Sequence, residues 1–436
     1  MKKFLILLIC ILILTSCGIE NDFSKTESET VDAFEYVSDV NSEENGLLTE
    51  KYNVLNHEYM KAVWLSQFDM KAIYQNDGKQ RNKTDFVRLV TRVLNNLKND
   101  GYNTVIVQVR PYADSFYPSD LYPVSNFVSG EYGDEDIYDP FEIIIDLAHS
   151  KGISVHAWLN PMRAMTVKEI ASVPDKYAIK QWYEDSSLEN KYVVDVDGRL
   201  YLNPAYETVR QLIADGAKEV CENYNVDGVH IDDYFYPTTD PSFDRAAYSE
   251  YVNNGGKATL AKYRNEMLDL MVSSIYASVK SVDKEILFGV SPAGNINHTY
   301  KDLYADVYKW CSNKGYLDYI CPQIYFGLEH STYDFVSVYN TWCSAVKNED
   351  IRITVGMTLG KAKQGYDNYA GDGKYEWSEH KDIMKRCLEY LNEREECSGI
   401  SIFCYQYMYD PITGESVEET KLERDNMSPI LEKLGK

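Results

Sequence analysis

Eight short apolar segments recur along the chain, and each is followed by a segment with helical periodicity. The intervening segments begin near Asp or Thr and end at Gly, as at 84–101 and 139–152, which is typical of helix caps. The apolar segments are rich in β-branched and aromatic residues, as buried strands are, and they lie at residues 61–68, 104–111, 153–161, 227–233, 286–292, 319–325, 351–357 and 399–405. Strands that alternate with helices pair in parallel. The pattern therefore predicts an α/β fold, a closed (β/α)8 TIM barrel, with a doubly wound open sheet as the alternative.

The start of the chain follows another pattern. Two lysines precede an uninterrupted apolar run, and small residues follow it before Cys17. This is typical of a secretory signal and is too short for a permanent membrane span. The residues LTSC at 14–17 resemble a bacterial lipobox, whose cysteine is acylated and becomes the new N-terminus. We expect a lipoprotein signal peptide at 1–17 and an extracytoplasmic protein of the bacterial cell envelope, anchored to the membrane through lipid on Cys17. The alternative is a plain signal peptide.

The next segment is acidic and lacks periodicity. Residues 18–50 carry ten acidic residues against one lysine, Lys25, and few large apolar groups, so they cannot bury enough surface to fold. We predict a flexible tether at 18–55 and one catalytic domain at 56–436, a length that fits a barrel with insertions.

Charge and cysteine content limit the partners and cofactors. Lys and Arg number 44 against 68 Asp and Glu, a net charge of −24, which argues against nucleic acid or a bare anionic polymer as partner. Seven cysteines follow Cys17, an odd number without CxxC spacing, mostly inside apolar patterns. They predict buried free thiols rather than a disulfide framework or a zinc cluster. We expect no cofactor, no metal and a monomer.

Polar residues gather where the predicted strands end, which is where a (β/α)8 barrel places its chemistry. They are Arg110 and Asp114, Asn160 and Arg163, Asp232 and Asp233, Ser291 and Asn295, and Gln323 and Tyr325. Because side chains alternate along a strand, the residues expected to face the barrel axis are His156, Trp158 and Asn160 in one strand and His230, Asp232 and Tyr234 in another. Asp232 is then the better-placed carboxylate. Asp233 is expected at the strand's exit, either in the cleft or holding the loop.

Long tyrosine-rich loops follow the second, third and fourth predicted strands and are expected to form a cleft. They cover 111–125, 161–208 and 234–258, and Asp197-Gly198 in the second loop predicts a hairpin. Aromatic faces can stack on the C–H faces of sugar rings, and hydroxyl, amide and guanidinium groups can bind sugar hydroxyls.

Five ordered motifs then carry a resemblance. VQVRPYADSFYPSD, ISVHAWLNPMRA, YLNP, VDGVHIDDYFYP and CPQIYF resemble the glycosyl-hydrolase-like 10 family of secreted or lipid-anchored (β/α)8 proteins linked to cell-wall glycan hydrolysis. The resemblance spans about 58–405 and carries over the family's motif positions as Arg110, Asp114, His156, Asn160, Arg163, Asn203, His230, Asp232, Asp233, Gln323 and Tyr325. The fourth motif also resembles a chitinase-type strand motif, but Tyr234 stands where that motif has a glutamate. The substrate-assisted chitinase mechanism is therefore not transferred.

The resemblance implies a glycoside hydrolase acting on a polysaccharide, with a cell-wall glycan as the expected substrate. Such enzymes use one carboxylic acid and one carboxylate. We expect Asp232 to be the nucleophile or base, kept ionised by a neighbour such as Arg110 or His230, and Asp114 or Asp233 to be the acid. The expected substrate-binding residues are Arg110, His156, Trp158, Asn160, Arg163, Asn203, His230, Tyr234, Gln323 and Tyr325, with the two histidines in supporting roles.

Two other functions remain open at this point. The first is a catalytically inactive glycan-binding lipoprotein on the same barrel. The second is a metal-dependent hydrolase in which His156, His230 and Asp232 converge on one ion, although the chain has no HxH motif in its first strand and no HExxH.

Overall fold

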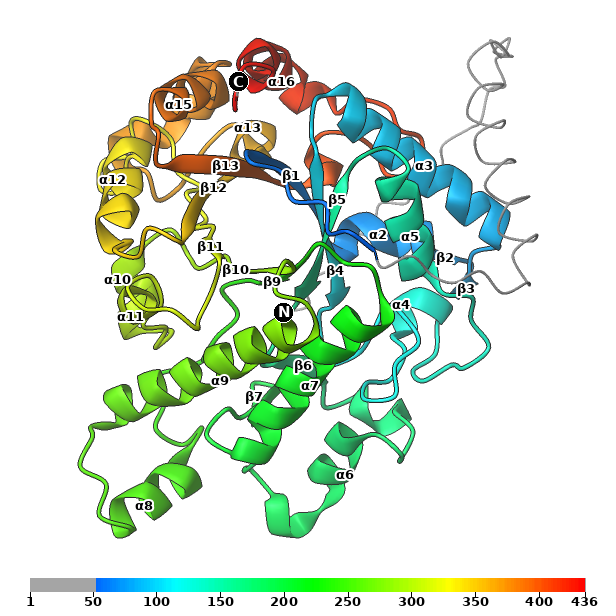
Figure 1. The fold of residues 1–436 in the computed structure, drawn as a ribbon, viewed down its shortest axis with the longest axis vertical. Helices are drawn as coiled ribbons and strands as arrows, with labels where there is room; N and C mark the ends of the chain where they lie inside the picture. The colour runs from blue at the N-terminus through cyan, green and yellow to red at the C-terminus, as the bar shows by residue number, and fades with distance from the viewer. Residues whose placement is uncertain (1–51, 436) are drawn as a thin grey trace, which may run out of the picture. The chain divides into compact units, whose positions relative to one another are not determined.

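The computed structural model describes residues 52–435, so Cys17, the predicted signal peptide and the tether up to residue 51 lie outside the described residues. Residues 52–435 all belong to one compact unit, which contains the barrel. Its eight strands are all parallel and closed, because β1 pairs with both β4 and β13 (Figure 1). In chain order they are β1 (Met60–Leu65), β4 (Thr104–Arg110), β5 (Ser154–Leu159), β9 (Gly228–Ile231), β10 (Leu287–Val290), β11 (Tyr319–Ile320), β12 (Arg352–Thr358) and β13 (Cys397–Phe403). Each predicted strand segment overlaps one of them, and the closure of the sheet confirms the barrel over the open sheet.

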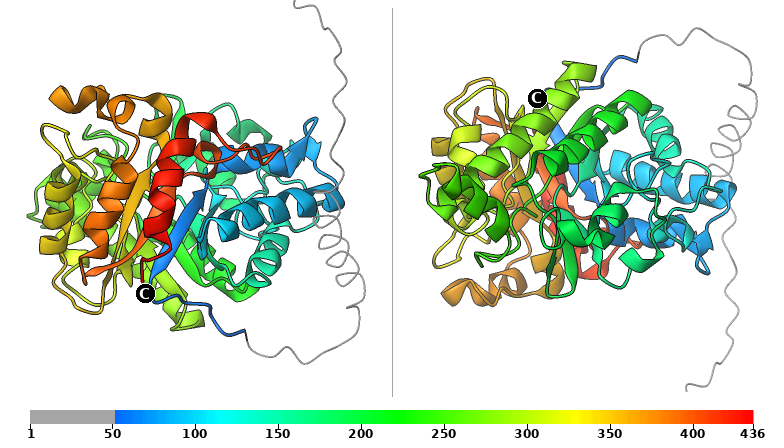
Figure 2. Two further views of the ribbon diagram at one scale, coloured as in Figure 1. Left: turned by 90° about the horizontal axis from the view of Figure 1, so that it is seen from above. Right: turned by 90° about the horizontal axis from the view of Figure 1, so that it is seen from below.

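Helices surround this barrel (Figure 1). The longer ones are α3 (Lys83–Asn99), α5 (Pro140–His149), α7 (Glu207–Asn223), α9 (Leu260–Val282), α12 (Phe335–Ala345), α15 (Ile383–Asn392) and α16 (Glu418–Leu431). The shorter ones include α2 (Gln67–Tyr74), α4 (Asn126–Ser129), α6 (Ala178–Glu184), α8 (Arg245–Asn253), α10 (Ile296–Lys301), α11 (Val307–Trp310), α13 (Gly360–Gln364) and α14 (Glu376–Glu379). The views in Figures 1 and 2 agree that α7 and α9 lie side by side.

Of the two helix starts predicted from the sequence, the one at Asp139 is confirmed, whereas α3 begins at Lys83, before Thr84, and is capped by Asn82. The Asn82 side chain accepts from the backbone N–H of Asp85 at the start of α3, and Asp139 caps α5, whose first residue is Pro140. Proline at that position sacrifices no helical hydrogen bond. One side of α3 is apolar and buried, including Phe86, which is how an amphipathic helix covers a barrel.

A chain of aromatic and histidine side chains fills the barrel axis. Trp64 Nε1 lies 3.4 Å from His230 Nε2, and the Tyr319 hydroxyl lies 2.8 Å from His230 Nδ1 and 2.9 Å from His156 Nδ1. Because Trp64 can only donate, His230 donates to the Tyr319 oxygen, and Tyr319 donates to His156. Burial lowers the pKa of His156 to about 4 and that of His230 well below its ordinary value. Both histidines are therefore neutral supports of the barrel interior.

Two glycines make room for these rings. A Cβ added to Gly289 would lie 1.9 Å from Cζ of Tyr319, and one added to Gly228 would lie 2.6 Å from Nδ1 of His156. Both distances are far below van der Waals contact, so no larger residue fits at either position without moving a ring.

The excursion after β5 contains a small antiparallel sheet of β6 (Arg163–Thr166), β8 (Arg199–Leu202) and β7 (Val193–Val196), in that order. The predicted hairpin is confirmed: β7 and β8 are joined by Asp197 at φ 53° and Gly198 at φ 86°. Two consecutive residues in the left-handed region match the twist of tight hairpins. This sheet places Arg163 beside the barrel mouth.

The start of the described chain contacts the opposite end of the barrel. Asp227 is fully buried and accepts from the Tyr52 hydroxyl at 2.6 Å, the Leu55 amide at 2.6 Å and the Val155 amide at 2.7 Å. Residues 52–55, which the sequence assigned to the tether, thus contact the barrel. The seven cysteines of the described body are free thiols, six of them buried and Cys343 half-buried. Every helix among residues 52–435 is too short or too polar to span a membrane.

Candidate active site

A pocket of about 110 Å³ opens at the C-terminal ends of the barrel strands. Larger hollows occur elsewhere, including one of about 250 Å³ beside Asp100 and Arg424, but Asp100 precedes β4 and so lies at the opposite end of the strands. Seven of the residues expected from the sequence line the mouth pocket: Trp158, Arg163, Asp232, Asp233, Tyr234, Gln323 and Tyr325. The pocket's lining therefore combines two adjacent carboxylates with aromatic rings.

Asp232 lies just beyond β9 and is 3 % exposed. Asn160 Nδ2 donates to its Oδ1 at 2.8 Å and its Oδ2 at 2.7 Å, Trp158 Nε1 donates to Oδ2 at 3.0 Å, and the Tyr234 amide donates to Oδ1 at 3.2 Å. Both oxygens thus act as acceptors, which is the arrangement that a carboxylate needs. The expected inward direction of Trp158, Asn160 and Asp232 agrees with these contacts.

Asp233 turns into the same pocket. Gln323 Nε2 donates to its Oδ1 at 3.2 Å and also to the Ser291 carbonyl at 3.0 Å. Gln323 lies after β11, where Pro322 interrupts the strand but bridges to Ala293 and Gly356 continue its line. Asp233 therefore lies in the cleft, which is one of the two positions expected from the sequence.

Arg163 forms one wall of the pocket, between two tyrosine rings. Its guanidinium carbon lies 4.4 Å from the centre of the Tyr234 ring and 4.9 Å from that of Tyr112. Such stacking holds the flat group in place while leaving its edge for polar contacts. Its positive charge lowers the pKa of Asp233, in opposition to burial.

Burial raises the pKa of both carboxyl groups, and the charge of Asp233 raises that of Asp232 further. Two carboxylates this close in a desolvated site resist simultaneous ionisation, so they titrate as a pair. The four hydrogen bonds that Asp232 accepts favour the charge on Asp232. The remaining proton is then best held by Asp233, whose Oδ1 alone accepts a side-chain hydrogen bond within residues 52–435.

Comparison with known proteins shows the family of this chain. The model of the glycosyl hydrolase-like 10 family matches residues 59–370. The chain belongs to the glycosyl hydrolase-like 10 family. It is 28% identical over 342 residues to glycosyl hydrolase YngK of Bacillus subtilis, covering 72% of this chain and 63% of YngK. It is 29% identical over 388 residues to glycosyl hydrolase DigH of Escherichia coli K12, covering 82% and 85% of the two chains.

Solved structures share the fold of this family member. The glycoside hydrolase domain of PgaB from Bordetella bronchiseptica gives a TM-score of 0.53 at 13% identity, covering 85% of this chain and 99% of that one. The catalytic domain of β-amylase from Paenibacillus polymyxa gives 0.54 at 10% identity, covering 85% and 98%. At such low identity the likeness shows the barrel alone.

Arg110, which the sequence predicted at the site, does not line the pocket, so it cannot keep Asp232 ionised as expected. A bulge between Gln108 and Arg110 shifts the register, so that Gln108 pairs with Trp158 but Arg110 pairs with Leu159. The shift turns Arg110 outward, where it donates to the Tyr117 hydroxyl and, at 3.1 Å, to the Gly216 carbonyl of α7.

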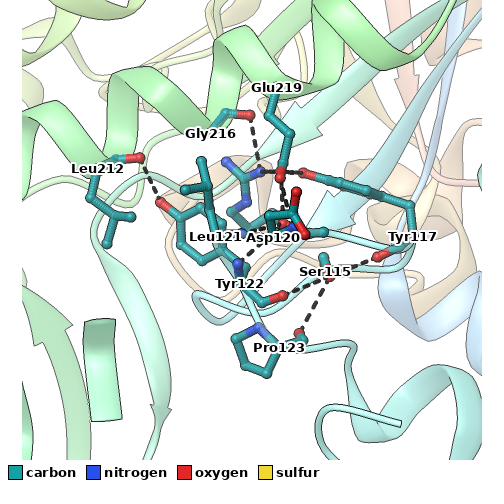
Figure 3. Close-up of polar contacts among 11 residues, drawn as sticks. Ser115, Tyr117, Asp120, Leu121, Tyr122, Pro123, Leu212, Gly216 and Glu219 are labelled. Atoms are coloured by element: carbon teal, nitrogen blue, oxygen red, sulfur yellow. Dashed lines mark hydrogen bonds and ion pairs between the residues drawn. The ribbon is translucent and has the colours of Figure 1, made fainter. Parts of the chain in front are cut away.

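The cluster around this arginine fixes the loop after β4 against α7 (Figure 3). Glu219 lies 3.9 Å from the Arg110 guanidinium and accepts from the Ser119 hydroxyl at 2.7 Å and the Asp120 amide at 2.9 Å. Tyr122 donates from its hydroxyl to the Leu212 carbonyl at 3.1 Å. The role of Arg110 in the structure is thus to hold this loop. His230 cannot supply charge to Asp232 either, because its pKa is lowered and its ring is neutral.

Two further expected residues lie behind the pocket rather than on its lining. Asp114 is fully buried, accepts from the Tyr112 amide at 2.9 Å, and burial raises its pKa to about 6. Asn203 is fully buried before α7 and accepts from the Ala205 amide at 3.1 Å. Asp114 is linked to the site indirectly: it accepts from the Tyr112 amide, and the Tyr112 ring lies against the Arg163 guanidinium.

Six residues of the pocket were absent from the sequence prediction: Trp64, Ser66, Gln67, Phe68, Gln108 and Phe403. Three of them follow β1, which ends at Leu65 rather than extending to residue 68. The signal was present, because Ser66 and Asp69 form a capping box that starts α2 at Gln67. If the predicted strand had ended at Leu65, residues 66–68 would have counted as a loop at a strand end, where a barrel places its site residues.

Among residues 52–435, no group of three or more His, Cys, Asp or Glu side chains is arranged to hold a metal ion. The Nδ1 atoms of His156 and His230 face Tyr319, while Asp232 is held by Trp158 and Asn160. The three side chains therefore do not converge on one point as the metal-dependent alternative requires.

Proposed function

We propose that this protein is a glycoside hydrolase that cleaves a polysaccharide, with a cell-wall glycan as its substrate, through Asp232 and Asp233. The observation that carries the proposal is the pair of adjacent carboxyl groups in one aromatic pocket at the barrel mouth. Membership of the glycosyl hydrolase-like 10 family supports the same chemistry. Hydrolysis of a glycosidic bond needs one carboxylic acid and one carboxylate flanking that bond.

Asp232 is proposed as the nucleophile, or as the base that activates a water. Its hydrogen bonds from Asn160 and Trp158 stabilise the ionised form and fix its direction. A fixed carboxylate in a desolvated site stabilises the positive charge that develops on the sugar ring in the transition state, and it needs no reorganisation to do so.

Asp233 is proposed as the general acid that protonates the leaving oxygen. Burial raises the pKa of Asp233, which favours a proton on it at a pH where an ordinary aspartate is ionised. Asp114, the other candidate, does not line the pocket and reaches the site only through Tyr112. Tyr234 occupies the position at which the chitinase-type motif has its acidic glutamate, so the general acid must be another residue of the pocket. Asp233 is the carboxyl group of the lining besides Asp232.

We also propose that the protein is held at a bacterial membrane, on the extracytoplasmic side, by lipid on Cys17. The support is the sequence alone: an apolar segment followed by LTSC at 14–17. An acidic tether would then set the barrel away from the bilayer, where an anionic segment avoids anionic lipid.

The test is incubation of the detergent-solubilised full chain with purified cell-wall glycan strands, glycol chitin and soluble starch, followed by mass spectrometry of the products. We expect oligosaccharides from the cell-wall glycan and none from the Asp232→Asn variant. Saturable binding without product from any polymer would instead identify a glycan-binding protein on a hydrolase barrel.

A further inference from the structure

Phe68 is the most exposed aromatic side chain of the pocket. It is 63 % exposed although it lines the cavity that holds Asp232 and Asp233. Trp64 and Trp158, in the same pocket, are buried. An apolar ring exposed to water beside a carboxylate pair offers a surface whose burial by a ligand is favourable.

The backbone under Phe68 is rigidly held. Asp69, fully buried, accepts from the Ser66 amide at 2.5 Å and from the Gln406 amide at 2.6 Å, which ties the start of α2 to the segment after β13. The Gln67 amide donates to Gln108 Oε1 of β4 at 2.8 Å. With both neighbours fixed to the barrel, the backbone of Phe68 is held beside the pocket.

An unsatisfied polar atom accompanies the ring. The Gln67 side chain is 2 % exposed, lines the pocket and donates through Nε2 to the Tyr112 hydroxyl, yet its Oε1 has no hydrogen-bond partner within residues 52–435. A buried carbonyl oxygen without a donor is rare in native proteins, because it loses its hydration without compensation. A hydroxyl or amide N–H of a bound sugar can supply the missing donor.

We propose that Phe68 and Gln67 form a sugar-binding subsite beside the cleaved bond, in which the apolar face of an uncharged pyranose ring stacks on Phe68 and a polar group of the same sugar donates to Gln67. This subsite rests on the proposed glycoside hydrolase function. A flat aromatic face next to a hydrogen-bond acceptor matches the two kinds of surface that a sugar ring presents. Phe68 does not touch the reacting atoms, so it binds and positions the chain.

The test compares Phe68→Ala with the parent protein on the polymer that the full chain cleaves. We expect KM to rise about threefold to tenfold while kcat changes less than twofold, because the stacking contact is lost equally in the ground and transition states. Phe68→Trp keeps an aromatic face at this position, so its KM should equal that of the parent protein. Tyr369→Ala is the matched control, since Tyr369 is 86 % exposed but does not line the pocket, and it should leave KM unchanged.

Binding is measured separately from turnover, by affinity electrophoresis of Asp232→Asn with and without Phe68→Ala in gels that contain the same polymer. We expect weaker retardation of the double variant. Equal KM and equal retardation with and without Phe68 would overturn the subsite while leaving the hydrolase function in place. Absence of both product and retardation with cell-wall glycan, glycol chitin and starch would overturn the proposed function and the subsite with it.

Discussion

Replacement of Asp232 by asparagine separates the charge of this side chain from its shape. The parent carboxylate receives four hydrogen bonds, from Asn160 to both oxygens and from Trp158 and the Tyr234 amide. An asparagine keeps one of the two acceptor oxygens and places its NH₂ against a donor. That mismatch costs about 1–3 kcal/mol, but loss of a buried charge beside Asp233 acts in the opposite direction. We therefore expect the variant to fold, with a free energy of unfolding within about 2 kcal/mol of the parent's.

The effect on catalysis should be much larger. A carboxylate about 4 Å from a unit positive charge, at an effective dielectric constant of about 20, contributes about 4 kcal/mol. The sugar ring acquires most of such a charge in the transition state, and each 1.36 kcal/mol is a factor of about ten in rate. Asp232→Asn should therefore lower kcat by about several hundredfold to a thousandfold, and further if Asp232 forms a covalent bond to the sugar.

The assay is the steady-state release of oligosaccharides from the cleaved polymer, with binding measured in parallel by affinity electrophoresis. Substrate binding should survive, because the aromatic lining is unchanged by the substitution. Retention of more than about a tenth of the parental kcat by a folded Asp232→Asn variant would refute the reasoning. Asp233 would then become the candidate nucleophile.

Other consequences can be measured independently. Asp233→Asn should abolish cleavage of the natural polymer but partly spare an activated aryl glycoside of the same sugar, whose leaving group needs no proton; equal losses on both substrates would contradict its role as the acid. Arg163→Met should move the alkaline limb of the kcat/KM profile to higher pH, because the guanidinium lowers the pKa of Asp233 and its removal lets the acid keep its proton longer; an unchanged or lower limb would argue against this coupling. Cys17→Ser should release the protein from the membrane fraction or leave its precursor uncleaved, and fractionation like that of the parent would exclude the lipid anchor.

The sequence by itself determined the elements of the barrel and the direction of most inward-facing side chains. Strand and helix periods are local properties, so the eight apolar segments and their caps could be assigned without contacts. Alternation along two strands predicted that Trp158, Asn160 and Asp232 face the barrel axis. The hydrogen bonds among these three side chains agree with that direction. The same local reasoning located the hairpin at Asp197-Gly198.

The tertiary structure decided what local patterns cannot encode. The bulge before Arg110 arises from the pairing of β4 with β5, and a single shift in register moved this arginine from the barrel axis to α7. The contact of Asp233 with Gln323 joins residues 90 positions apart. Whether Asp232 or Asp233 keeps the proton depends on burial and on hydrogen-bond donors that are distant in the sequence, such as Asn160 and Gln323. The side-chain period belongs to each strand, whereas register, burial and electrostatic coupling arise only when the eight strands close on one another.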